Sequence, residues 1–381
     1  MGPIWRRSNF RSSEHSPSGQ MRDESVVERV VRATNHLRCA LLSGFTTYRD
    51  LGSEGMESHD ARLRDCVNRG LVPGPRLFVA TDALAGTGGY EARTENAAGG
   101  VRLPKISEAC DGIADVRRAV RSRVAAGADV IKFYADYRRK TMRFPPAHAG
   151  DASSSIKFPP ANPNPVVPLL SQDEMDEIVR EAKLAELPVA AHAQSAKAAL
   201  MAVHAGVTSV EHVSEATDEL FREMRLRGCI FVPTLSVLQD LAGDDFPRIQ
   251  RNAKKAFDAG VRLAVGGDTG AFPHGEGARE LELLIEAGIP VEDVLEACTV
   301  GGWESCGGDQ CGYRFGWFEN GARADIIALD TDPREDKGAL RKVGFVMKDG
   351  QVWKKDYIPV VMMNQLMRES SSSANNAWEL L

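Results

Sequence analysis

One local pattern recurs along this 381-residue chain and limits the folds open to it. A helical run ends in a small residue and a glycine, and a β-branched or aromatic strand follows at once. Glycine enters the left-handed conformation at the end of a helix without steric cost, so it marks where each helix stops. The pattern occurs in CALLSGFTTYRD, RVAAGADVIKFY, AVHAGVTSVEH and AFDAGVRLAVGGD, with the glycines at Gly44, Gly127, Gly206 and Gly260.

These junctions and three variants of them predict seven strands separated by helices. Strands that alternate with helices pair in parallel through right-handed crossovers. The last four strands start about 20 to 30 residues apart, which is typical of a (β/α)8 barrel or a doubly wound sheet. No GxGxxG follows the first strand, which weakens the second alternative. The strands are expected near residues 45–50, 76–81, 129–135, 188–193, 208–213, 229–235 and 262–268.

Composition excludes several classes of function. A net charge of −6 argues against a nucleic-acid surface, and no apolar run of about 18 residues marks a membrane span. The seven cysteines form no CxxC, so we expect reduced thiols and no cysteine metal site. We therefore expect a cytoplasmic protein that acts on a small molecule, with neither nucleic acid nor membrane as partner. Assembly into a homo-oligomer stays open.

Polar residues interrupt or close four of the predicted strands. They are Lys132 in VIKFY, His192 in PVAAHAQS, His212 in TSVEHVSE and Asp268 in LAVGGDTG. In a parallel barrel, chemistry gathers at the carboxyl ends of the strands. Two imidazoles and a carboxylate are common ligands of a divalent transition metal.

Each of these residues alone has a simpler explanation. A histidine at a strand end is more often a hydrogen-bonded structural residue, and Gly-Gly-Asp often forms a turn. Lys132 in an apolar strand is also consistent with a Schiff-base nucleophile. The coincidence of all four at strand ends favours the metal site.

The chain resembles the metal-dependent amidohydrolases, in their imidazolonepropionase-like and prolidase-like group. The resemblance covers about residues 26–358. It implies a TIM-type barrel with a small β-sandwich and hydrolysis of carbon–nitrogen bonds in amides or dipeptides. The stretches that carry it are GFTTYRDLG, GPRLFVAT, GADVIKFYADYR, AAHAQS, GVTSVEHV, GGDTG, PHGEGARELELLIEAG and FENGARADIIALD.

The resemblance also implies roles for the four strand-end residues. Lys132 would be N6-carboxylated and would bridge two metals, most simply zinc. An apolar environment lowers a lysine's pKa, and the neutral amine can add carbon dioxide. His192 and His212 would hold the more exposed metal. Asp268 would bind the buried metal and act as the base.

The sequence departs from the family at its start. The family's first strand ends in His-x-His, and this chain contains none. His15 and His36 do not close strands, and His59 lies in a loop. We therefore expect a disordered leader over 1–25, a barrel over 26–310 without its first strand, a β-sandwich remnant over 311–358 and a mobile tail over 359–381. One or two weakly held metals are expected.

Candidate substrate contacts follow the Lys132 strand and the Asp268 strand. Tyr134, Tyr137 and Arg138 lie in ADYRRK or just before it, and an arginine there is suited to clamp a carboxylate, although a solvated basic loop explains it equally well. His274 in FPHGEGARE and Tyr90 in GTGGYEAR are further candidates. Three functions remain open: an active amidohydrolase, a catalytically impaired truncated relative, and a metal-free Schiff-base enzyme.

Overall fold

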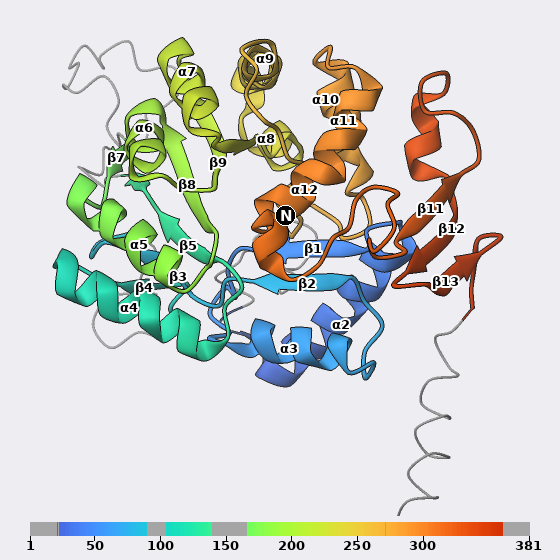
Figure 1. Cartoon of the computed structure of the whole chain (residues 1–381), viewed down its shortest axis with the longest axis horizontal. Helices are drawn as coiled ribbons and strands as arrows, with labels where there is room; N and C mark the ends of the chain where they lie inside the picture. The colour runs from blue at the N-terminus through green and yellow to red at the C-terminus, as the bar shows by residue number, and fades with distance from the viewer. Residues whose placement is uncertain (1–20, 22, 90–103, 139–165, 271, 361–381) are drawn as a thin grey trace, which may run out of the picture.

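The computed structural model describes residues 21, 23–89, 104–138, 166–270 and 272–360. Strands and helices alternate through most of the chain, as the glycine junctions predict (Figure 1). Up to residue 258 the elements are α2 (Val26–Leu42), β1 (Thr47–Asp50), α3 (His59–Asn68), β2 (Arg76–Val79), β3 (Ala83–Ala85), β4 (Ser107–Ala109), α4 (Gly112–Ala126), β5 (Ile131–Tyr134), β6 (Asp136–Arg138), β7 (Val166–Pro168), α5 (Gln172–Leu184), β8 (Val189–Ser195), α6 (Ala196–Ala205), β9 (Ser209–Glu215), α7 (Asp218–Arg227), β10 (Ile230–Val232), α8 (Leu235–Leu241), η2 (Gly243–Asp245) and α9 (Phe246–Asp258).

After a segment without regular strands, the chain continues as helices and then as an antiparallel sheet. These elements are α10 (Ala278–Glu286), α11 (Val291–Cys298), α12 (Val300–Ser305), η3 (Gly308–Cys311), β11 (Ile326–Leu329), η4 (Lys337–Arg341), β12 (Val343–Lys348), β13 (Gln351–Lys355) and β14 (Ile358–Pro359).

The helix ends form where the sequence predicts them. Gly44, Gly127, Gly206 and Gly260 all have positive φ, between 77° and 101°. At the other end, Ser25 and Ser171 form capping boxes with glutamates three residues on, which satisfies backbone N–H groups that the first helical turn leaves unpaired. Local sequence chemistry therefore sets where α2 and α5 begin and where α4 and α6 end.

Parallel pairing dominates the first two thirds of the described chain. One sheet has the order β10-β9-β8-β5-β3-β4, and β1 pairs with β2 separately. The Asp129 and Val130 N–H groups donate to the Val79 carbonyl, which joins the end of β2 to the start of β5. Helices α3 to α7 lie outside these strands (Figure 1). Within the described ranges, no strand pairs with the outer edge of β1.

The predicted strand at 262–268 is wrong in its extent. This segment makes a single parallel bridge, from Leu263 to Phe231, and then leaves the sheet. The reason lies in its glycines and in Asp268, because Gly266-Gly267 disfavours regular pairing and Asp268 has a φ of 57°. The short strands β3, β4, β6 and β7 were not expected from the sequence.

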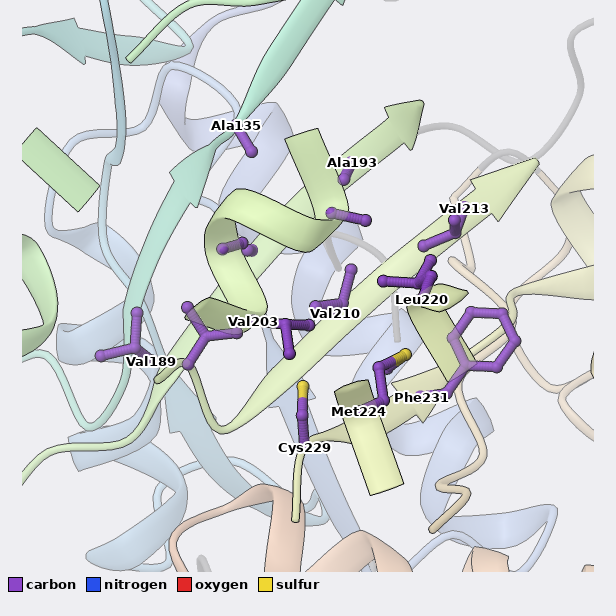
Figure 2. Close-up of a cluster of buried hydrophobic side chains, with 14 of the residues drawn as sticks. Ala135, Val189, Ala193, Val203, Val210, Val213, Leu220, Met224, Cys229 and Phe231 are labelled. Atoms are coloured by element: carbon purple, nitrogen blue, oxygen red, sulfur yellow. The ribbon is translucent and has the colours of Figure 1, made fainter. Parts of the chain in front are cut away.

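A large apolar cluster fixes β8, β9 and β10 against their helices (Figure 2). Val189, Val210 and Phe231 come from the three strands, and Leu220 and Met224 come from α7. All five are 3% exposed or less. Burying such side chains stabilises a fold by about 1.5–3 kcal/mol each, so the strands that carry His192 and His212 are well packed.

The C-terminal sheet has the order β11-β12-β13-β14 and is antiparallel, as expected for residues 313–358. Asp349 and Gly350 both have positive φ, 52° and 78°, which is the turn geometry that an Asp-Gly hairpin favours. Val343, Val346 and Trp353 of this sheet pack on Leu41 of α2. The sheet is thereby attached to the barrel's first helix.

Two further findings concern the chain as a whole. All seven cysteines are free thiols. No helix of the described residues has the length and apolar character needed to cross a membrane.

The packing of α12 can be tested at two adjacent glycines. A Cβ at Gly301 would overlap the Leu263 carbonyl oxygen, whereas one at Gly302 would meet nothing within 4 Å. We expect Gly301→Ala to lower the free energy of unfolding by about 1–3 kcal/mol, because the helix must move. Gly302→Ala should raise it by about 0.5–1 kcal/mol through helix propensity. Urea unfolding measures both, and equal effects would contradict the close approach of α12 to residue 263.

Candidate active site

Lys132 lies inside the barrel on β5 and is 4% exposed. Burial lowers the pKa of its amine from 10.5 to about 8; Glu211 opposes this shift, and Arg49 adds to it. A substantial fraction of the amine is therefore neutral near pH 8. A neutral amine is the form that can add carbon dioxide or form a Schiff base.

His192 and His212 come together beside this lysine. They lie midway along the neighbouring parallel strands β8 and β9, with His212 opposite Ala193 and His192 opposite Tyr134 of β5. The two imidazole ring centroids are 4.6 Å apart in an edge-on arrangement. Burial holds the pKa of His192 well below its usual value, and His212 and Lys132 lower it further. His192 is thus a neutral imidazole, the form that ligates metals.

Left-handed backbone conformations gather at the strand ends that carry these residues. His212, Val213, Thr234 and Asp268 have φ values of 77°, 48°, 52° and 57°. For the β-branched Val213 and Thr234 this conformation is a true outlier. Each such residue costs about 1–3 kcal/mol and persists only when its surroundings enforce it. Clustered strain of this kind is typical of functional sites.

Asp268 lies within electrostatic reach of Lys132 and His192. Its charge raises the pKa of both Lys132 and His192. It is half-buried, at the end of the segment that bridges to β10. The structure therefore gathers Lys132, His192, His212 and Asp268, all four of the strand-end residues, in one region.

A buried ion pair that sequence reasoning missed spans the barrel interior. Arg49 of β1 donates from Nη2 to Glu211 Oε1 of β9 at 3.0 Å, and from Nη1 to Ser209 Oγ and the Ser305 carbonyl at 2.9 Å each. Both charged residues are 3% exposed or less. Burial raises the pKa of Glu211, but Arg49 and then Lys132 outweigh this and hold it at about 2.

A second missed carboxylate holds the end of β8. Asp136 is fully buried and accepts hydrogen bonds from the N–H groups of Gln194 and Ser195 and from the Ser195 hydroxyl, at 2.7–3.0 Å. These groups lie two and three residues after His192 on the same strand. The only sequence signals for Arg49 and Asp136 are charges next to apolar strand residues.

His192, His212 and Lys132 are the side chains in this region that could serve as ligands of a divalent metal. Within the described ranges, no three His, Cys, Asp or Glu side chains meet in a metal-binding arrangement. The imidazole pair fits two ligand positions, with His192 neutral. Lys132 adjoins it, and a carbamate on its nitrogen would supply the third, anionic donor. The residues present thus suit one metal better than two.

The predicted substrate contacts are only partly placed. The Tyr134 ring lies 5.0 Å from that of His192, centroid to centroid. Tyr137 and Arg138 belong to β6, which pairs with β7. The Arg138 side chain and the whole of Tyr90 lie outside the described residues, as do His15 and nearly all of the 1–25 and 359–381 segments.

Two other histidines make contacts with residues outside the cluster around Lys132. His274 is 9% exposed and stacks on His36 of α2, with ring centroids 3.9 Å apart. His59, expected in a loop, instead begins α3, and its Nδ1 contacts the Met56 carbonyl at 2.5 Å. Substrate binding by His274 stays a prediction.

The buried lysine predicts a pH dependence of stability. Between pH 8 and 10.5 the unfolded chain keeps the Lys132 proton and the folded chain releases it, so stability rises with pH over this window. In metal-free, carbon-dioxide-free buffer, the gain of wild type relative to Lys132→Met should approach about 3 kcal/mol. Urea unfolding at several pH values measures this, and a constant difference between the two proteins would contradict the buried, shifted amine.

Comparison with known proteins identifies the family to which the chain belongs. A family model described as "Amidohydrolase family" matches residues 11–354. Ochratoxinase of Aspergillus niger is 31% identical over 348 residues, covering 83% of this chain and 66% of that protein. An uncharacterized protein of Mycobacterium tuberculosis is 26% identical over 205 residues, covering 49% of this chain and 54% of that protein. The chain thus spans just under two thirds of the first of these relatives.

Solved structures share the fold. A Xaa-Pro dipeptidase with bound methionine superposes with a TM-score of 0.74 at 27% identity, covering 92% of this chain and 84% of the other. A prolidase complexed with N-methylphosphonate-L-proline gives 0.72 at 25% identity, covering 93% and 85%. The expected fold class, a TIM-type barrel with a small C-terminal β-sheet, is confirmed. The motif resemblance is confirmed as well: this chain belongs to the amidohydrolase family, in its prolidase-like group.

Proposed function

We propose that this chain is a metal-dependent hydrolase that cleaves the carbon–nitrogen bond of a small amide or dipeptide. The observation that carries the proposal is the pair of imidazoles, His192 and His212, 4.6 Å apart beside a buried lysine on three neighbouring parallel strands. Family membership supports it, because members of this family are generally metal-dependent. The relatives include proteins named for a dipeptidase and an ochratoxinase.

His192 and His212 would hold the metal, with zinc the first candidate at one or two ions per chain. The Lys132 nitrogen would add to the carbon of carbon dioxide and lose one proton, which leaves an N6-carboxylate whose oxygen joins the imidazoles. A divalent metal lowers the pKa of water and polarises a carbonyl. The depressed pKa of Lys132 supports this role, since the amine must be neutral to react.

Asp268 would act as the proton-transfer group of the reaction. It would accept one from the attacking water and pass it to the leaving nitrogen, which becomes an amine as the carbon–nitrogen bond breaks. Its left-handed backbone holds it at the end of the segment from Leu263, close enough to influence Lys132 and His192 electrostatically. Tyr134 would form a wall of the substrate pocket beside His192. Roles for Tyr137, Arg138, His274 and Tyr90 in binding substrate are part of the same proposal.

The first test removes one imidazole. His192→Ala should lower zinc affinity and reduce hydrolysis of dipeptides and N-acyl amino acids by about 100-fold or more, because a ligand is lost rather than merely misaligned. His204→Ala is the matched control, since His204 lies on the outer helix α6 and contacts Glu223. Zinc titration and a hydrolysis assay with added zinc measure both effects. Unchanged zinc binding in His192→Ala would exclude the proposed ligand set.

Arg138 gives a test of substrate class. Arg138→Ala should raise KM about tenfold or more for amides that carry a free carboxylate, since a charge-assisted hydrogen bond is lost. KM for the same substrates with the carboxylate amidated should change little. Equal changes for both substrate sets would argue against a carboxylate clamp.

Two alternatives have observations in their favour. The absence of His-x-His from the sequence favours a catalytically impaired relative. Zinc-loaded protein that binds the dipeptides without hydrolysing any of them would support that alternative.

The buried, partly neutral Lys132 is equally suited to a Schiff base. Borohydride reduction with a carbonyl substrate would fix that substrate on Lys132 only in the latter case.

A further inference from the structure

Thr234 occupies an unfavourable position two residues after the end of β10. It is 2% exposed, and its backbone is left-handed, with φ 52° and ψ 46°. A β-branched residue adopts this conformation rarely, so its surroundings must enforce it. Its hydroxyl oxygen lies 2.8 Å from Nδ1 of His212. The strained residue is therefore in direct contact with one of the two clustered imidazoles.

Thr234 stands at the N-cap of α8 and yet does not cap it. A threonine at this position normally accepts a hydrogen bond from a backbone N–H of the first helical turn. Thr217, the N-cap of α7, does so and accepts from the Leu220 N–H. Thr234 makes no such bond. Its hydroxyl is thereby available to His212.

A buried glutamate from another helix takes over the capping. Glu280 of α10 is fully buried. Its Oε1 accepts from the Leu235 N–H at 2.8 Å, and its Oε2 accepts from the Ser236 N–H at 2.6 Å and the Ser236 hydroxyl at 2.8 Å. These groups follow Thr234 directly, so Glu280 both satisfies the start of α8 and holds the strained residue in place.

We propose that Thr234 and Glu280 are positioning residues that set the ring orientation and tautomer of His212. In this arrangement His212 Nδ1–H donates to Thr234 Oγ, and the lone pair of the neutral ring resides on Nε2, where it can ligate a metal. The effect on metal binding rests on the function proposed above. The tautomer itself does not, because it is a property of the metal-free protein.

The tautomer can be read by NMR on metal-free protein labelled with ¹⁵N at histidine, with the His212 signals assigned by their loss in His212→Asn. Wild type and Thr234→Ser should show the Nδ1–H form. Thr234→Val keeps the shape and branching of threonine but offers no acceptor, so it should shift His212 toward the Nε2–H form. Retention of the Nδ1–H form in Thr234→Val would overturn the proposal.

Glu280→Gln tests the same link without changing the neighbour of His212. One carboxylate oxygen becomes an amide that cannot accept, so Thr234 should lose part of its support and the tautomers should become mixed. Thr217→Val is the matched control, since it removes a hydroxyl from the preceding helix cap. It should lower Tm and leave the His212 spectrum unchanged. An unaltered His212 spectrum in Glu280→Gln would remove Glu280 from the proposal.

Zinc affinity provides the second readout. Thr234→Val should weaken zinc binding about 10- to 100-fold, and Thr234→Ser should stay within about threefold of wild type. Equal zinc affinity in Thr234→Val and wild type would overturn the link to metal binding. If wild type itself binds no zinc, the proposed function fails, whereas the tautomer shift still decides whether Thr234 positions His212.

Discussion

The ion pair between Arg49 and Glu211 is the interaction on which the barrel interior depends. It joins β1, at one edge of the described strands, to β9, several strands away, and it does so with both charges out of water. Removing one partner of such a pair leaves an uncompensated buried charge, at a cost of about 3–5 kcal/mol. Ser209 and the Ser305 carbonyl also accept hydrogen bonds from Arg49. The strands β1 and β9 and the helix α12 are therefore linked through this one side chain.

This pair also sets the electrostatic environment of Lys132. Glu211 is the carboxylate that raises the pKa of Lys132 most, but Arg49 binds it directly. Desolvation therefore dominates at Lys132, and its amine loses its proton more readily than an exposed lysine does. An unpaired Glu211 would favour the ammonium and oppose any reaction of the nitrogen with carbon dioxide. The candidate chemistry thus rests on a charge pair that takes no direct part in it.

Sequence patterns predicted the structure correctly where the interactions are local. The glycines that follow helices act through their own backbone, and each ends a helix or turn as predicted. Lys132, His192 and His212 could be found because each breaks an apolar strand. Family membership, indicated by the ordered motifs, followed from the same positions.

The remaining features depend on contacts between distant segments. Nothing near Arg49 in the sequence names Glu211 as its partner, and nothing near Thr234 shows that Glu280 will cap its helix in place of the threonine hydroxyl. The stacking of His274 on His36 of α2 is likewise a contact between distant segments. The length of the strand predicted at 262–268 was overestimated. Its apolar residues favour a strand, whereas the sequence gives no sign of the left-handed backbone of Asp268.

Val213 shows what the clustered strain means for the evolution of this chain. Its backbone is left-handed although its side chain branches at Cβ, so glycine would be the more comfortable residue there. Glycine would also let the end of β9 sample other conformations, and the adjacent His212 would move with it. Glycine would also remove a fully buried side chain from the apolar cluster, so the native valine tolerates the backbone strain in exchange for packing and a fixed backbone beside His212.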